Sequence, residues 1–399
     1  QLGGGFHRYS VDDHWTVPHF EKMLYDNSQL ARVYLHSYQV TLRPLYRRIV
    51  EEICDYVLRE MTDESGGFYS TQDADSEGEE GRFFTWIPEE VDDVLESDAA
   101  IFAEAYDITH TGNFEGKSIL NVKMTRAAIA ERYNLTEDMI ANKITDAKHK
   151  LWAVRELRVK PPLDDKVLTS WNGLMLAALA EAARVLGRED YLKAAIRNGT
   201  FLLNTMRTRD GRLLRAWRRG SKAKLNGYLE DYAYLAEALL ELYQATYDEC
   251  WFVAARDIVD VMVAHFTDET RGGFYDVSND HETLVFRPRD MQDNATPSGN
   301  AMAVTVLLKM ARYTGDREYY ERAEKAMLPM QTAMCQYPTA FGQWLQALSF
   351  ALGDPQEIGI VGDLTSSDTR ALLYEVQTVY LPHQVVAVAQ SSQDAAVPL

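Results

Sequence analysis

Apolar side chains recur every three or four residues in several stretches of the chain, which is the spacing of one face of an α-helix. The pattern is clear over about 18–40, where Pro18 is expected in the first helical turn. It returns in three later stretches that include Trp171, Tyr232 and Ala303. The spacing therefore predicts four similar amphipathic helices.

Each of these helices is followed, after a short connection, by a second helical pattern. The second helices are expected at about 43–62, 189–208, 249–266 and 316–332. Helices joined by short connections form antiparallel hairpins. Further helices are expected at about 88–97, 139–158 and 337–352.

Loop length differs between the two ends of these hairpins. The turns inside a hairpin are short, whereas the segments before the first helices are long and hold most of the Gly, Trp, His and paired acidic residues. Because hairpins alternate in direction, the long segments should emerge at one end. Glycine-aromatic openings recur at 4–6, 66–69 and 272–275, which indicates an internal repeat.

These features predict an all-α fold, an (α/α)6 toroid of antiparallel helix hairpins that lacks one hairpin. Its inner helices would line a cavity and its long loops would form the mouth. An open α-solenoid is the alternative, although solenoid repeats are usually shorter. Short strands at 357–362 and 384–389 flank a helix near 366–378. We therefore expect a toroid domain over 1–353 and a small C-terminal α/β appendage over 354–399.

Composition limits the partners of the chain. A net charge of −19 argues against nucleic acid and against an anionic membrane surface, because no basic patch is available to release counterions. No run approaches about 18 apolar residues, so no membrane-spanning segment is expected. Three widely spaced cysteines favour a reducing cytoplasm over a disulfide framework or a zinc site. With no P-loop, G-x-S-x-G or H-E-x-x-H motif, neither a cofactor nor a metal is expected.

The densest cluster of polar and aromatic residues lies near the start of the chain. On a helix beginning near residue 18, His19, Lys22 and Asp26 would share one stripe beside the apolar face. One interpretation is a substrate-binding wall with His19 or Glu21 transferring protons. The other is a polar network that caps and closes helices. The candidate residues of this cluster are His7, Arg8, Trp15, His19, Glu21, Lys22, Tyr25 and Asp26.

An acidic loop follows, with five carboxylates in the eight residues from Asp73. It starts like a calcium-binding loop, but Phe84 stands where a bidentate Glu is needed. Paired acids at a cavity mouth also suit glycoside chemistry. A solvated acidic loop is the alternative to a site that uses Asp73 and Asp75.

Later segments place acidic, amide and aromatic groups together before or at the start of predicted helices. Sugars are bound by aromatic faces and by planar amide or carboxylate groups. Ordinary helix capping explains the Asp and Asn residues equally well. The candidates from these segments are Trp86, Lys166, Trp171, Asn172, Asp231, Tyr232 and Asn300.

The motifs at 4–12, 17–27, 73–78, 164–172 and 297–300 closely resemble the thioredoxin-domain-containing family that includes spermatogenesis-associated proteins and bacterial homologues. The resemblance implies a thioredoxin-like domain followed by a helical toroid similar to six-hairpin glycosidases and N-acylglucosamine 2-epimerases. This chain carries no C-x-x-C motif. Its abrupt glycine-rich start suggests that the natural protein is longer.

Two classes of function follow from these observations. The first is a sugar-active enzyme, either a glycosidase with Asp73 or Asp75 opposite Asp231, or an isomerase with His19 or His7 as base. Trp15, Trp86 and Trp171 would supply the sugar platform. The second is a non-catalytic binding or scaffold module that serves a thioredoxin-like domain. The expected partner is a small sugar or glycan, with that domain as the protein partner.

Overall fold

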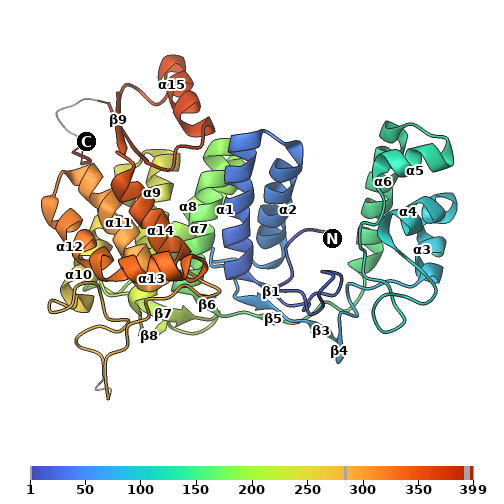
Figure 1. The fold of residues 1–399 in the computed structure, drawn as a ribbon, viewed down its shortest axis with the longest axis horizontal. Helices are drawn as coiled ribbons and strands as arrows, with labels where there is room; N and C mark the ends of the chain where they lie inside the picture. Colours follow the sequence, from blue (N-terminus) through green and yellow to red (C-terminus); the bar gives the residue numbers. More distant parts are fainter. Residues whose placement is uncertain (1, 283–284, 391–395, 399) are drawn as a thin grey trace. The chain divides into compact units, whose positions relative to one another are not determined.

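The computed structural model describes residues 2–282, 285–390 and 396–398 (Figure 1). Its contacts divide the chain into two compact units, residues 1–23 with 71–164, and residues 24–70 with 165–399. The boundary expected after residue 353, between the toroid domain and the C-terminal appendage, stays a prediction.

Four helical hairpins form most of the second unit. In each hairpin the first helix is an inner helix and the second an outer helix. The inner helices are α1 (Leu24–Thr41), α7 (Thr169–Leu186), α9 (Leu229–Thr246) and α11 (Gly299–Thr314), with α14 (Gly342–Leu352) as a fifth. The outer helices are α2 (Pro44–Glu60), α8 (Glu189–Thr205), α10 (Glu249–Phe266) and α12 (Arg317–Met327). The predicted hairpins are thereby confirmed.

The inner helices pack in the order α1, α7, α9, α11, α14 and point the same way. At their N-terminal ends, the backbone N–H of Ser170 donates to Asp231, which links the starts of α7 and α9. At the other end, Gln39 of α1 donates to the carbonyl oxygen of Gln377 in the C-terminal segment. Within this unit, the long loops that precede α9 and α11 therefore share one end, as predicted (Figure 1).

Close packing between α7 and α9 depends on one glycine. A Cβ atom on Gly173 would lie 2.9 Å from the backbone carbon of Tyr234, which is closer than a methyl group tolerates. Both helices are buried nearly all round, and α7 is rich in alanine and leucine. An apolar helix without a polar face belongs inside a protein, which explains why α7 and α9 are inner helices.

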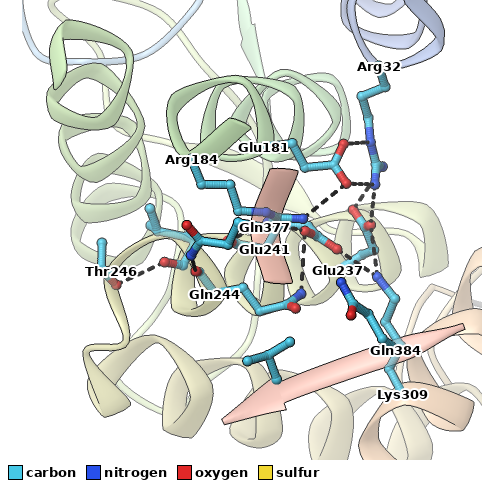
Figure 2. A network of polar contacts seen from close by, with 12 residues as sticks. Arg32, Glu181, Arg184, Glu237, Glu241, Gln244, Thr246, Lys309, Gln377 and Gln384 are labelled. Carbon is cyan, nitrogen blue, oxygen red and sulfur yellow. Dashed lines mark hydrogen bonds and ion pairs between the residues drawn. The ribbon is translucent and has the colours of Figure 1, made fainter. Parts of the chain in front are cut away.

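Six charged side chains form a closed ring between the inner helices, which we call the charge ring (Figure 2). The ring alternates in sign, with each acidic residue between two basic ones. Its contacts are Arg32–Glu181 (2.8 Å), Glu181–Arg184 (3.5 Å), Arg184–Glu241 (2.6 Å), Glu241–Lys309 (2.8 Å), Lys309–Glu237 (3.4 Å) and Glu237–Arg32 (2.9 Å). The three carboxylates and three cations thus compensate one another.

The charge ring keeps its members ionised despite their burial. Burial alone would raise the pKa of Glu241, but Lys309 and Arg184 outweigh it and lower that pKa to about 2. Burial likewise opposes the ionised form of Glu181, and Arg32 with His36 lowers its pKa well below the ordinary value. A buried charge network of this kind is costly to break at a single member.

Two loops of the second unit repeat one hydrogen-bonding pattern. In the first, the backbone N–H of Asp63 donates to Gly67, and Asn172 binds both the N–H and the carbonyl of Phe68. In the second, Asn300 binds the N–H and the carbonyl of Phe274 in the same way. The glycine-aromatic repeat at 66–69 and 272–275 is thus structural: it docks a loop onto the start of the next inner helix.

The helix predicted over 18–40 is wrong at its beginning. Helix α1 starts at Leu24, and the preceding residues form strand β1 (Lys22–Met23), which pairs with β2 (Thr71–Gln72). Strand pairing with a segment distant in sequence overrides the local helical spacing. His19 and Lys22 therefore do not share a helical stripe with Asp26.

The first unit also contains β5 (Leu163–Asp164), which pairs with β2, and a hairpin of β3 (Asp75–Ser76) and β4 (Glu79–Glu80). Four helices build its core, and the helices predicted near 88–97 and 139–158 are among them. They are α3 (Pro88–Leu95), α4 (Ala99–Tyr106), α5 (Arg126–Tyr133) and α6 (Glu137–Arg155). Phe102, Ile129 and Ile140 are among the buried side chains of that core.

The second unit carries two small sheets. Near the N-terminal ends of the inner helices, β6 (Val167–Leu168), β7 (Leu214–Trp217) and β8 (Lys224–Asn226) form an antiparallel sheet. Near their C-terminal ends, the parallel strands β9 (Gln356–Val361) and β10 (Gln384–Ala389) are connected through α15 (Ser367–Thr378), as the sequence predicted. Among the described residues, no helix is long and apolar enough to cross a bilayer.

Candidate functional site

The candidate site lies at the mouth, the N-terminal ends of α7 and α9 with the loops that precede α9 and α11. Asp231 is fully buried there. It accepts hydrogen bonds from the backbone N–H groups of Ser170 and Tyr228, both at 2.8 Å, and from Arg215 at 3.2 Å. Burial raises the pKa of Asp231 to about 6, although Arg215 opposes that change. Asp231 therefore holds two segments together beneath the surface of the mouth.

Glu230 presents its carboxylate at the surface of the mouth, where its side chain is 29% exposed. Arg215 on β7 forms an ion pair with it at 2.9 Å. The same guanidinium lies 4.4 Å from the ring centre of Tyr228, whose aromatic face it covers. Arg215 thus fixes the positions of a carboxylate and an aromatic ring.

Asp276 is the second partly exposed carboxyl group of the mouth. It directly follows the repeated Gly-Gly-Phe-Tyr segment, and its carbonyl oxygen accepts from the N–H of Leu229 at the start of α9. Burial, followed by the negative charges of Asp290 and Glu230, raises the pKa of Asp276 to about 6, although a backbone hydrogen bond from Asp290 opposes the rise. Two carboxyl groups in contrasting environments therefore lie near each other.

Aromatic side chains border this end of the inner helices. Trp171, partly exposed at the start of α7, packs against Tyr25 of α1 with ring centres 4.8 Å apart. Tyr228 is 36% exposed beside Glu230. Apolar ring faces next to carboxylates provide the mixture that sugar binding uses.

Several predicted site residues of the second unit are committed to the protein's own backbone. Asn172 and Asn300 are fully buried in the loop-docking contacts described above. Tyr232 is also fully buried, and its hydroxyl accepts from the N–H of Leu213 at 2.9 Å. Lys166 is exposed, and Asp26 is partly buried in the first turn of α1. The role of Asp26 in catalysis and the roles of the other residues in substrate binding stay predictions.

The N-terminal cluster belongs to the first unit, apart from Tyr25 and Asp26. His7 donates from Nδ1 to the carbonyl oxygen of Phe20 at 2.8 Å, and burial with the nearby Lys22 lowers its pKa well below the usual value. Lys22 is 2% exposed and donates to the carbonyl oxygen of Gly4. Glu21 pairs with Arg8 at 3.2 Å and lies 3.7 Å from His19.

The remaining candidates of the first unit differ widely in exposure. Asp73 and Asp75 are exposed, and Asp73 accepts hydrogen bonds from the next two backbone N–H groups. Trp15 is 86% exposed, whereas Trp86 is 1% exposed within the core of that unit. The predicted pairing of Asp73 or Asp75 with Asp231 joins residues of different units and stays a prediction.

Sequence reasoning missed four residues that build the mouth. Arg215, Tyr228, Glu230 and Asp276 were not among the candidates. The repeat could have revealed Asp276, because it follows the second Gly-Gly-Phe-Tyr segment directly. Within the described ranges, no group of three or more His, Cys, Asp or Glu side chains is arranged to hold a metal ion.

Comparison with known proteins gives relatives but no matching family model. The chain is 32% identical to spermatogenesis-associated protein 20 of Homo sapiens and to that of Rattus norvegicus, over 97% of this chain and 54% of each relative. The predicted resemblance to these proteins is confirmed. The chain spans about half the length of the curated relatives it matches, and a thioredoxin-like domain stays a prediction.

A solved structure supports the fold class. Cellobiose 2-epimerase from Bacillus thermoamylovorans matches with a TM-score of 0.50 and 11% identity, over 83% of this chain and 66% of that one. A D-mannose isomerase covers 82% of this chain and 81% of that one with a TM-score of 0.43 and 13% identity. At such identities the likeness concerns the fold alone. The predicted all-α toroid fold class is confirmed.

Proposed function

We propose that this chain is a carbohydrate-directed enzyme that cleaves a glycosidic bond at the mouth of its toroid. The observation that carries the proposal is the pair of Glu230 and Asp276, two partly exposed carboxyl groups in contrasting environments. Asp276 has a pKa raised to about 6, and Glu230 is the carboxylate of an ion pair. Two carboxyl groups in environments that differ in this way can serve as a general acid and as a base or nucleophile.

In the proposed reaction, Asp276 protonates the leaving glycosidic oxygen while Glu230 attacks the anomeric carbon or activates a water molecule. Arg215 keeps the Glu230 carboxylate in place, and Asp231 below it holds the start of α9. Tyr228 and Trp171 offer ring faces on which a sugar can pack. Each role uses a residue of the second unit.

The alternative is a non-catalytic sugar-binding module that serves a thioredoxin-like domain of the cytoplasm. One observation favours it: Asn172, Asn300 and Asp231 use their polar atoms to hold the protein's own backbone. A second is that the chain spans 54% of its human relative, which leaves room for another domain there.

Aryl glycosides of several neutral sugars test the proposal, with release of the aryl group as the readout. We expect turnover by the unmodified chain and a loss of about 100- to 10,000-fold in Glu230→Gln and Asp276→Asn. The matched control is Glu324→Gln, because Glu324 is an exposed residue on α12. Sugar binding without turnover would favour the binding module. Turnover that survives both substitutions would exclude this pair as the catalytic groups.

A further inference from the structure

A polar cavity lies between the inner helices, and its lining includes neither Glu230 nor Asp276 of the mouth. Its volume is about 260 Å³. Helices α1, α7, α9, α11 and α14 line it together with residues of the segment 376–386, which follows and partly includes α15. The charge ring lies on its wall, and Gln377 and Gln384 approach the ring from this segment (Figure 2).

The charge ring determines which charge a ligand can carry. All six members line the cavity, and each is already within ion-pair distance of a partner of opposite sign. A charged ligand would lose its hydration on entering the cavity. The ring offers no uncompensated charge of opposite sign to offset that cost. The cavity therefore favours a neutral molecule.

The remaining wall is rich in amides and hydroxyls. Six glutamine side chains line the cavity, and they come from α1, α9, α14 and the segment 376–386: Gln39, Gln244, Gln343, Gln346, Gln377 and Gln384. The buried Oε1 atom of Gln384 accepts no hydrogen bond from any described residue. A buried acceptor of this kind requires a donor, which a ligand hydroxyl would supply.

The shape and size of the cavity limit the possible ligands further. His36 and Tyr380 stack at the cavity wall with ring centres 4.5 Å apart, which gives one flat, weakly polar surface. Pockets for drug-sized ligands usually hold about 300–1,000 Å³, so this cavity suits a smaller molecule. An apolar ligand would leave the buried Oε1 atom of Gln384 without a hydrogen-bond donor.

We propose that this cavity is a binding site for a neutral polyhydroxylated molecule of monosaccharide size. The amides of Gln384 and Gln346 contact its hydroxyl groups, and the stacked rings of His36 and Tyr380 face its carbon skeleton. The site is separate from the mouth and does not depend on the reaction proposed there.

Calorimetric titration of the chain tests this site. The neutral probes are myo-inositol, sorbitol and D-mannose, and the charged probes of similar size are gluconate and glucosamine. Millimolar probe concentrations avoid the general stabilisation that polyols give at high concentration. We expect at least one neutral probe to bind and both charged probes to bind more weakly.

Variants locate the binding. Gln384→Met and Gln346→Leu keep the size of each side chain and remove one amide, so each should weaken binding about three- to tenfold. Gln336→Leu, on the exposed face of α13 (Gln331–Gln336), is the matched control and should leave binding unchanged. Circular dichroism checks that each variant is folded, and two independent cavity variants guard against a misfolded one.

The proposal would be overturned if no neutral probe bound, if the charged probes bound as tightly as the neutral ones, or if both cavity variants kept full affinity. Glu230→Gln separates the two sites: binding that this mouth substitution abolishes would place the sugar at the mouth and would also overturn the cavity site. Unchanged binding in Glu230→Gln supports the cavity, whatever the outcome of the glycoside assay.

Discussion

Replacing Glu241 by Gln should destabilise the second unit far more than the loss of an exposed carboxylate does. Glu241 is the member of the charge ring that joins Arg184 at 2.6 Å to Lys309 at 2.8 Å. Its side chain is 3% exposed, so water cannot reach the site to stabilise the cations that lose their partner. The substitution leaves three partly buried cations facing two carboxylates.

Two independent routes give the size of this effect. Removing one partner of a buried ion pair costs about 3–5 kcal/mol. The pKa of Glu241, about 2 in place of 4.5, corresponds to roughly 3–4 kcal/mol at about 1.4 kcal/mol per pKa unit. With an unfolding entropy of about 2.1 cal/mol/K per residue over roughly 280 residues, 3 kcal/mol lowers the Tm by about 5 °C.

Urea unfolding followed by circular dichroism measures the change in the free energy of unfolding. Glu324→Gln, an exposed residue on α12, serves as the matched control and should change stability by less than about 0.5 kcal/mol. The double variant Glu241→Gln with Lys309→Met should be more stable than the single variant, because it removes the surplus positive charge. A loss below about 1 kcal/mol in the single variant, or no recovery in the double variant, would refute the role of the ring.

Three further predictions follow from the fold and the mouth. Asn172→Ala should cost about 2–4 kcal/mol of unfolding free energy, because the N–H and carbonyl of Phe68 lose their partner; a cost below 1 kcal/mol by urea unfolding would contradict the loop-docking role. Hydrogen bonds from Arg271 and Thr270 outweigh burial and lower the pKa of Asp268 to about 2, so its contribution to stability is present above about pH 4 and lost as the pH falls towards 2. In an acid titration, Asp268→Asn should therefore lose less folding stability than the unmodified chain. Identical titration curves would refute this. Asp276 must be protonated to act as an acid, so kcat/KM should fall about tenfold per pH unit above pH 6, and a profile flat to pH 8 would exclude that role.

Periodicity predicted most helices well, because amphipathic spacing reflects burial on one face. Helix α10 and strand β10 occupy the predicted residues, 249–266 and 384–389. The start of α1 could not be predicted in this way. Phe20 and Met23 have helical spacing, but their segment is extended because β1 pairs with residues almost 50 positions further along the chain.

Long-range contacts also explain what was missed at the candidate site. In the charge ring, Arg32 and Glu181 lie almost 150 positions apart in the sequence, and only the fold brings their side chains to 2.8 Å. Asn172 and Asn300 were predicted to bind substrate, yet each binds a loop backbone that lies 26 or more residues away. A polar residue at a helix start can serve a ligand or the chain itself, and sequence alone does not distinguish the two.

The most direct test of the proposed function is the structure of the chain in crystals soaked with the sugar that its best aryl glycoside carries. The account predicts a sugar ring over Tyr228, with the carboxyl groups of Glu230 and Asp276 on either side of its anomeric carbon. A sugar bound at the mouth without contact to either carboxyl group would contradict this account. So would a mouth that stays empty at saturating sugar.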